Sequence, residues 1–188
     1  MSTAAKEATA DLLRAVYGRD LLPAEIEILP DANGAPLVDA PGLGDLDLKP
    51  VVSLAHAQGE AVAFAALAPK GEPAAVGIDI EPLRPLSPAL VGAALSDGER
   101  SLLGELPAEL ADEWLLRCWC AKEAAGKALG SGLAPGRREA PAVIAVDRDE
   151  QRVDVDAGGR RFVVHTRRDG DLIVATTLST PGSGKGQA

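Results

Sequence analysis

Two short runs of the sequence contain residue types that can hold a metal ion beside a phosphate group. They are Gly77-Ile78-Asp79-Ile80-Glu81 and Trp119-Cys120-Ala121-Lys122-Glu123-Ala124-Ala125-Gly126-Lys127. On a strand, Asp79 and Glu81 would point to the same side, within reach of one cation. On a helix, Glu123 and Lys127 are four residues apart and would share a face. Three carboxylates and a lysine at one place predict a site for a hard cation next to a phosphate.

Each of these residues also has a purely structural interpretation. Asp79 and Glu81 could end an exposed strand, and Glu123 could lie on a solvated helix face. Lys127 could form an ordinary helical ion pair with Glu123, a role that is compatible with phosphate binding. Because the spacing of all four residues fits one site, we favour metal binding over these alternatives.

The composition indicates a protein that folds without disulfide bonds. A chain of 188 residues with 46% hydrophobic content can bury a full core, as one domain or as two tightly packed halves. Cys118 and Cys120 are two apart in a helical run and would project from different faces, which argues against a disulfide or metal pair and fits a reducing compartment. The sequence has no export signal and no run of about 20 apolar residues, so we expect a cytoplasmic protein that does not contact a membrane.

The net charge limits the possible partners. A formal charge of −9 argues against a general nucleic-acid binder, which needs a basic face to neutralise phosphates. The richest basic stretches are Arg137-Arg138 and the group Arg160, Arg161, Arg167 and Arg168. We interpret them as the solvated edge of a sheet, where charge protects against unwanted strand pairing.

The first part of the chain is predicted to hold one helix and several strands. We expect a helix at 9–18, an edge strand at 25–29, a turn at 31–36, a loop rich in Gly and Pro up to Pro50, strands at 51–54 and 61–67 joined by a turn at 58–60, and a strand ending at Glu81. Residues 1–81 would form the N-terminal half. Three prolines, Pro82, Pro85 and Pro88, then exclude a regular element and mark the crossover to the second half.

The second part is predicted to be built around one long helix. Ser96 and Glu99 have the spacing of a capping box, which predicts a helix to about Leu103. We expect the longest helix at 108–129, with Trp114 and Trp119 as apolar anchors, followed by strands at 143–146, 153–155, 160–166 and 172–178 and a flexible tail at 181–188. Helices followed by antiparallel strands in both halves, 1–81 and 82–180, predict an α+β fold.

The two motifs resemble those of the 4′-phosphopantetheinyl transferases, a G-[IVF]-D-[IV]-E strand and W-x-x-K-E-[AS]-x-x-K on a long helix. The run Ala128-Leu129-Gly130-Ser131-Gly132-Leu133 is similar to the family's K-A-x-G-x-G-L ending, Val52-Ser53-Leu54-Ala55-His56-Ala57 to its S-x-S-H-S, and Asn33-Gly34-Ala35-Pro36 to its N-G-K-P. The resemblance covers roughly residues 10–178 and is to the monomeric, internally duplicated type. It implies two halves related by a pseudo-twofold axis, with the active site between them.

The resemblance also implies a reaction and roles for residues. A carrier-protein serine would attack the pyrophosphate of coenzyme A, take the phosphopantetheine arm and release adenosine 3′,5′-bisphosphate. Asp79, Glu81 and Glu123 would hold Mg²⁺, or Mn²⁺ in its place. His56, Lys122 and Lys127 would contact the phosphates of coenzyme A.

The base that takes the serine proton is left open by the sequence. Glu99 matches the family's proposed base, but its capping box is a rival structural role. Glu123 or a water on the metal could serve instead. Lone histidines such as His56 are more often bonded to the backbone than to a ligand, and only its motif context favours phosphate contact.

Three departures from the family pattern support a second hypothesis. Ala55 and Ala57 replace serines, and Ala35 replaces a basic residue that would face the 3′-phosphate of coenzyme A. Losing such a charged contact typically costs ~1.5 to 3 kcal/mol. The first hypothesis is a Mg²⁺-dependent enzyme acting on acyl or peptidyl carrier proteins of fatty-acid or polyketide systems. The alternative is a catalytically altered domain of the same fold that serves as a docking module, for example within a synthase, where tethering would offset poor long-range attraction to an acidic carrier.

Overall fold

The computed structural model describes residues 3–32, 34–70, 75–85, 87, 91–92, 95–104, 106–130 and 140–179. Several sequence predictions fall elsewhere. The Ser131-Gly132-Leu133 end of the motif, Asn33, Arg137-Arg138, Pro88 and the tail at 181–188 lie outside the described residues.

The described chain is a mixed α+β fold, which confirms the predicted fold class. Its elements are the helices α1 (Thr3–Tyr17), α3 (Asp97–Ser101) and α4 (Ala108–Ala128), the 3₁₀ turns η1 (Pro23–Glu25) and η2 (Leu43–Asp45), and the strands β1 (Glu27–Pro30), β2 (Pro36–Asp39), β3 (Leu48–Ala57), β4 (Glu60–Pro69), β5 (Ala75–Pro82), β6 (Ala142–Asp147), β7 (Arg152–Ala157), β8 (Arg160–Asp169) and β9 (Leu172–Ser179). No described helix is both long and apolar enough to cross a membrane.

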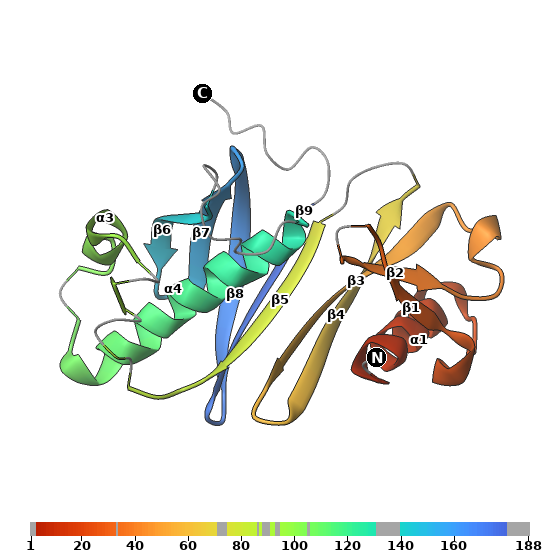
Figure 1. Cartoon of the computed structure of the whole chain (residues 1–188), viewed down its shortest axis with the longest axis horizontal. Coiled ribbons are helices and arrows are strands. Elements are labelled where there is room, and N and C mark those ends of the chain that lie inside the picture. Colours follow the sequence, from red (N-terminus) through yellow and green to blue (C-terminus); the bar gives the residue numbers. More distant parts are fainter. Residues whose placement is uncertain are drawn as a thin grey trace.

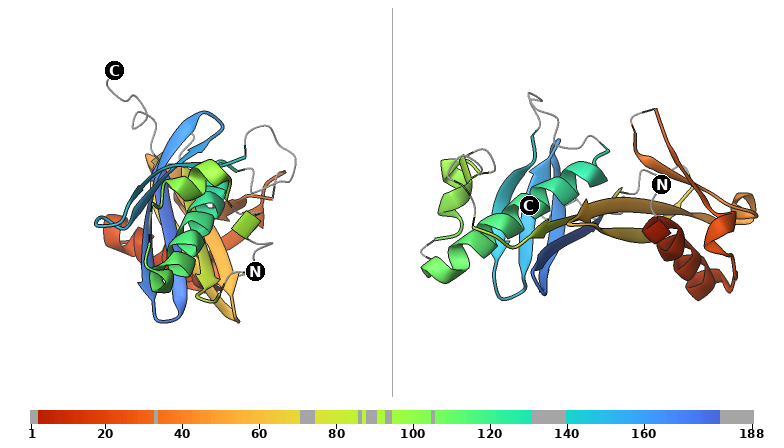
Figure 2. Two further views of the ribbon diagram at one scale, coloured as in Figure 1. Left: turned by 90° about the vertical axis from the view of Figure 1, so that its left-hand side faces the viewer. Right: turned by 60° about the horizontal axis from the view of Figure 1, so that its bottom comes forward.

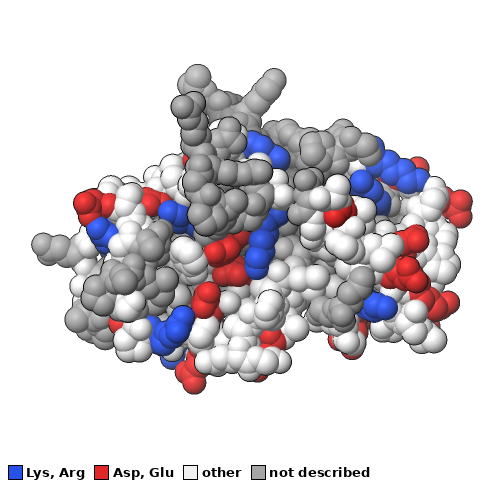
Figure 3. Space-filling view, in the orientation of Figure 1, with Lys and Arg blue, Asp and Glu red and all other residues white. Residues whose placement is uncertain are grey.

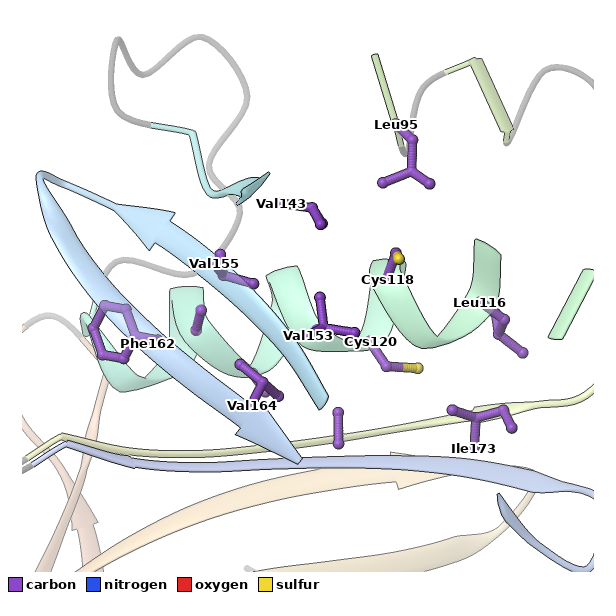
Figure 4. Close-up of a cluster of buried hydrophobic side chains, with 14 of the residues drawn as sticks. Leu95, Leu116, Cys118, Cys120, Val143, Val153, Val155, Phe162, Val164 and Ile173 are labelled. Carbon is purple, nitrogen blue, oxygen red and sulfur yellow. The ribbon is translucent and has the colours of Figure 1, made fainter. Parts of the chain in front are cut away.

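A five-stranded antiparallel sheet with order β5-β9-β8-β7-β6 carries α4 on one face (Figure 1). The apolar core lies between this helix and the sheet, because alternate residues of the strands point at the helix. Its members include Phe162, Val164, Val153 and Val155 from the strands and Leu116 from α4, all at most 1% exposed (Figure 4). The long helix is therefore fixed to the sheet along most of its length.

The hairpin β3–β4 packs on the opposite face of β5. Ala55 of the hairpin shares an apolar cluster with Ile78, Ile80 and Val174. The other face of the hairpin is covered by α1, whose Ala5 and Ala10 pack with residues of β1 and β3. In Figure 1, α4 with its sheet and α1 with its hairpin accordingly lie at opposite ends of the molecule, and the right-hand view of Figure 2 shows the same arrangement. The pseudo-twofold relation between two halves remains a prediction.

Strand β5 belongs by hydrogen bonding to the C-terminal sheet. It pairs with β9 over its whole length, with Asp79 opposite Ala175. The prediction that the strand ending at Glu81 closes the N-terminal half is therefore only a statement of chain order, because the strand's partner lies about a hundred residues away. Such non-local pairing leaves no local sequence signal.

The unpaired edge of β5 is satisfied by side chains instead of another strand. The Ile78 amide donates to Ser53 Oγ over 3.1 Å, and its carbonyl accepts from Lys127 Nζ over 3.0 Å. Buried backbone groups need partners, and these two bonds supply them from β3 and α4. The free edge of β5 thus joins the hairpin on one side to the long helix on the other.

The capping box and the long helix agree with the sequence predictions. Ser96 Oγ accepts from the Glu99 amide, Glu99 returns a bond to the Ser96 amide, and α4 ends at Ala128, one residue before the predicted end. The hairpin turn is tighter than predicted: Gln58 and Gly59 both have positive φ, so Glu60 already belongs to β4.

Two predictions about the N-terminal part are wrong. The first helix begins at Thr3 instead of residue 9, because the alanine-rich start is helical and Ala5 and Ala10 pack into the core. The loop predicted to reach Pro50 contains β2 and η2. Strand β2 pairs with β1, with Ile28 opposite Val38, and this partner is what turns a Pro-rich segment into a strand.

Candidate functional site

The two motifs meet where α4 crosses β5, at a point of very close approach. A Cβ built on Gly77 would lie 1.9 Å from the backbone oxygen of Ala124 and 3.2 Å from Ala128 Cβ. Only glycine can occupy this position without moving the helix. Because side chains alternate on a strand, Asp79 and Glu81 project to the same side as Gly77 and face the helix.

Asp79 is the most deeply buried carboxylate of the site. Its residue is 7% exposed, and Oδ1 accepts a hydrogen bond from Lys127 Nζ over 2.9 Å. Oδ2 is also buried but has no hydrogen-bond partner among the described residues. Burial raises the pKa of Asp79 above its ordinary value, although the adjacent Lys127 ammonium acts in the opposite direction. One oxygen of this carboxylate therefore faces the helix without a matching donor.

Glu123 adds a further negative charge to the same place. Burial, the Asp79 carboxylate and, to a smaller extent, the Glu81 carboxylate raise the pKa of Glu123, while Lys127 lowers it. These effects mean that the fold brings Asp79 and Glu81 within electrostatic reach of Glu123. Lys127 is the basic residue that acts on two of the three carboxylates, so negative charge is in excess.

Cys120 lies behind this group, and the sequence reasoning missed it. Burial raises its pKa well above the ordinary value, and the carboxylates of Asp79, Glu81 and Glu123 act in the same direction, so the thiol stays protonated. The thiol is a weak donor close to Asp79 and lowers that pKa, but it makes no hydrogen bond of ordinary geometry with the buried Oδ2. Figure 4 shows the two thiols on different sides of α4: Cys118 on the side of Leu95 and Cys120 toward the strand with Ile173. The predicted divergence of the two cysteines is confirmed.

Glu99 and Lys122 form a second group on another side of α4. Lys122 Nζ donates to Glu99 Oε1 over 2.8 Å, and the two side chains are 12% and 9% exposed. The Val143 amide donates to the same Glu99 oxygen, also over 2.8 Å. Lys122, expected from the resemblance to contact a phosphate, is thus engaged with Glu99 in this structure.

His56 stands apart from both groups. It alternates with Ala55 and Ala57, which pack toward β5, so the imidazole lies on the other face of β3 and is exposed. Among the described residues it forms no hydrogen bond or ion pair with the carboxylates of the site. Ala35 closes a tight turn: its carbonyl accepts from the Asp31 amide, and its own amide donates to the Asp31 side chain. Ala55, Ala57 and Ala35, which stand where the family has two serines and a basic residue, thus have structural roles in this chain.

A cleft of about 730 Å³ opens on the opposite side of β5 from the carboxylates. Ile78 and Ile80 form part of its floor, and because they alternate with Asp79 and Glu81, none of the carboxylates of the site lines it. Residues from α1, β4, the β8–β9 turn and β9 complete the walls. The cleft is consequently separate from the chemistry that the two motifs predict.

The surface at the crossing carries charges of both signs. Figure 3 shows acidic and basic side chains side by side near the middle of the face on which α4 lies. In the described part of the chain, no three His, Cys, Asp or Glu side chains stand close enough to form a complete ion cage. In this conformation the Lys127 ammonium supplies the positive charge next to Asp79.

The donor set nevertheless fits a hard divalent cation. All candidate ligands are carboxylate oxygens, one of which is buried and lacks a hydrogen-bond partner. Burial and the carboxylates of Asp79 and Glu81 also raise the pKa of Glu123, as expected where negative charges are not fully compensated. A cation accompanied by an anionic ligand would compensate both features.

Comparison with known proteins identifies the part of the chain that contains this site. Residues 75–177 match the family model described as 4′-phosphopantetheinyl transferase superfamily. This match runs from the first residue of β5 into β9, so it covers the five-stranded sheet and α4. No curated protein matches the sequence significantly.

One solved structure that resembles part of this chain is a holo-(acyl-carrier-protein) synthase from Bacillus anthracis str. Ames, in complex with CoA (3′,5′-ADP). The similarity covers 55% of this chain and 93% of that chain, with 23% sequence identity and a TM-score of 0.43.

Proposed function

Because the chain belongs to the 4′-phosphopantetheinyl transferase superfamily, we propose that it moves the phosphopantetheine arm of coenzyme A to a serine of an acyl or peptidyl carrier protein. The serine oxygen forms a bond to the phosphorus that bears the pantetheine arm. The bond between that phosphorus and the bridging oxygen breaks, the serine loses its proton, and adenosine 3′,5′-bisphosphate leaves.

The observation that best supports this proposal is the charge arrangement at the β5–α4 crossing. Asp79 has one oxygen on Lys127 and one buried oxygen without a hydrogen-bond partner, while Glu81 and Glu123 add negative charge around it. We propose that these three carboxylates hold Mg²⁺. A bound Mg²⁺ would neutralise the diphosphate and make its phosphorus accessible to an oxygen nucleophile.

In the proposed complex Lys127 has a second task. Its ammonium bonds Asp79 and the Ile78 carbonyl, and 29% of its side chain is exposed, so it can turn from Asp79 toward an anionic ligand. A lysine beside a phosphate stabilises the negative charge that shifts to the leaving group. If the Lys127 ammonium left Asp79 for the phosphate, Asp79 would become free to bind the cation. Cation binding and phosphate binding would then be coupled.

Glu123 is a better candidate than Glu99 for the base that accepts the serine proton, through the carboxylate oxygen that does not bind the cation. It is half-buried at the edge of the crossing, whereas both oxygens of Glu99 already accept hydrogen bonds from other parts of the protein. A base must reach the proton that it removes, which requires an oxygen that is free to turn.

The test is a mass measurement on the carrier protein. Apo acyl carrier and apo peptidyl carrier domains are incubated with the enzyme, coenzyme A and Mg²⁺, and each carrier is weighed intact. We expect the mass of one phosphopantetheine arm to be added by the wild type and not by Asp79→Asn.

Asp154→Asn is the matched control. Asp154 is a buried strand aspartate of the same sheet, 2% exposed, paired with Arg161, and it also has an oxygen without a hydrogen-bond partner among the described residues. The Asp154→Asn variant should be less stable than the wild type but should still transfer the phosphopantetheine arm. Absence of a mass gain with the wild type on both carrier types would refute the proposal and favour a docking role for the fold.

A further inference from the structure

Glu99 is held by hydrogen bonds from three different elements. Oε2 accepts from the Ser96 amide over 2.7 Å, at the start of α3. Oε1 accepts from Lys122 Nζ of α4 and from the Val143 amide of β6, both over 2.8 Å. The carboxylate thereby ties α3, α4 and the beginning of β6 together.

These bonds leave Glu99 poorly suited to proton transfer. Burial by itself would raise its pKa, but the hydrogen bonds from Lys122, Ser96 and Val143 outweigh burial and hold the pKa of Glu99 below its ordinary value. An efficient base has a pKa near the working pH and an oxygen that can reach the substrate. Glu99 has neither property, whereas a fully bonded buried carboxylate is a good structural anchor.

The anchor and the candidate site lie on different sides of the same helix. Apart from burial, the charges that act on the pKa of the Cys118 thiol are those of Glu99 and Lys122. The charges that act on the pKa of the Cys120 thiol are those of Asp79, Glu81 and Glu123. Cys118 and Lys122 are one turn apart and form one stripe of α4. The stripe that faces β5 is another, with Ala124 against Gly77 and Lys127 on Asp79.

The position of α4 decides where Glu123 and Lys127 point. Lys122 precedes Glu123 directly, so any rotation or shift that breaks the Lys122–Glu99 bond also moves Glu123 relative to β5. Helix α3 has only five residues and could not hold a position by its own hydrogen bonds.

We propose that Glu99 and Lys122 are a positioning pair, which fixes the rotation and height of α4 over β5 and thereby orients Glu123 and Lys127 for the transfer reaction. This inference rests on the proposed function. It assigns neither residue a contact with coenzyme A or with the reacting serine, in contrast to the roles that the family resemblance implied.

A double-mutant cycle tests the pair. In Glu99→Gln the Lys122 ammonium loses its carboxylate, and in Lys122→Met the Glu99 carboxylate loses its cation. The double variant removes both charges and leaves a neutral contact of similar volume. We expect each single variant to lower the melting temperature, and the double variant to melt above at least one of them.

The same cycle is read out in transfer kinetics, well below the melting temperature of every variant. A displacement of Glu123 on the order of 1 Å would lower kcat about 100-fold in the single variants. The double variant should regain at least tenfold, with an unchanged pH profile and a KM for coenzyme A close to that of the wild type.

Glu113→Gln provides the matched control. Glu113 pairs with Arg117 on the same helix over 2.7 Å, with side chains 14% and 6% exposed, but lies far along α4 from Glu123. It should lower the melting temperature while leaving kcat within about twofold of the wild type. An equal loss of kcat in this variant would overturn the specific role of Glu99 and Lys122.

Other outcomes identify the competing roles. If Glu99 is the base, Glu99→Gln loses kcat without a change in melting temperature, the double variant recovers nothing, and the pH profile loses its acidic limb. If Lys122 binds a phosphate, Lys122→Met raises the KM for coenzyme A and the double variant keeps that defect. Either result overturns the proposal.

If the wild type transfers no arm, the proposed function fails. The positioning pair is refuted separately if the changes in melting temperature of the two single variants simply add in the double variant.

Discussion

The very close approach of β5 to α4, at Gly77 and the Ala124 carbonyl, predicts a severe effect of adding one methyl group. In Gly77→Ala the new Cβ would start 1.9 Å from a backbone oxygen, whereas real contacts of this kind are essentially never shorter than 3.0 Å. Strand β5 and helix α4 must therefore separate by about 1.1 Å. Neither backbone can yield alone, because one is paired with β9 and the other belongs to the hydrogen-bonded backbone of α4.

The cost follows from this displacement. Overpacking of a rigid site typically costs about 1 to 3 kcal/mol, which corresponds to roughly 2 to 12 °C in the melting temperature of a chain of this size. The same shift moves Asp79 away from Glu123 and Lys127, so we expect the transfer rate to fall about 100-fold in the protein that remains folded.

The assay combines thermal unfolding with carrier-protein mass spectrometry at a temperature where both variants are folded. Gly44→Ala is the matched control, because a Cβ at Gly44 would meet nothing within 4 Å and its φ is not positive. It should change the melting temperature by no more than about 2 °C. A Gly77→Ala protein with wild-type melting temperature and wild-type rate would refute the reasoning about the crossing.

Three further predictions concern the charges and thiols around the site. Glu123→Gln should raise the melting temperature in EDTA above pH 7, because burial and neighbouring carboxylates raise the Glu123 pKa and make its ionised form costly in the folded state. This advantage should vanish as the pH falls below the ordinary pKa of a glutamate. Lys127→Met should lower stability by about 1 to 3 kcal/mol, less than for a fully buried pair because 29% of the Lys127 side chain is exposed, and Mg²⁺ should recover part of the loss. Cys118 and Cys120 should resist a thiol reagent in the native protein and react in denaturant, because both are fully buried and burial raises the pKa of Cys118 to about 12.

Each of these outcomes has a direct contradiction. A Glu123→Gln protein that melts below the wild type in EDTA would mean that Glu123 is stabilising without a cation. An unchanged free energy of unfolding in Lys127→Met would mean that the bond between Lys127 and Asp79 does not stabilise the fold. Rapid modification of either thiol under native conditions would show that α4 opens easily.

The local parts of the site were predictable from the sequence. The alternation around Asp79 predicts a strand with two carboxylates on one side, and the spacing of Glu123 and Lys127 predicts a shared helix face. The capping box at Ser96 is likewise a matter of residues three apart. Each of these signals depends on the backbone periodicity of a single element, which neighbouring residues determine.

The long-range contacts were not predictable. Lys127 bonds Asp79 and the Ile78 carbonyl instead of forming only a helical pair with Glu123, and this depends on how closely α4 approaches β5. Glu99 is both a cap and a partner of Lys122, which lies 23 residues further along the chain. A single sequence contains no measure of such distances, so it left the choice between a catalytic role and a structural cap for Glu99 open.

The central claim, that Asp79, Glu81 and Glu123 hold a divalent cation next to a diphosphate, is tested most directly by calorimetric titration of Mg²⁺ into the protein saturated with coenzyme A. We predict one bound ion per chain in the wild type and in Asp154→Asn, and no measurable binding in Asp79→Asn. Equal stoichiometry and affinity in Asp79→Asn and the wild type would contradict the account.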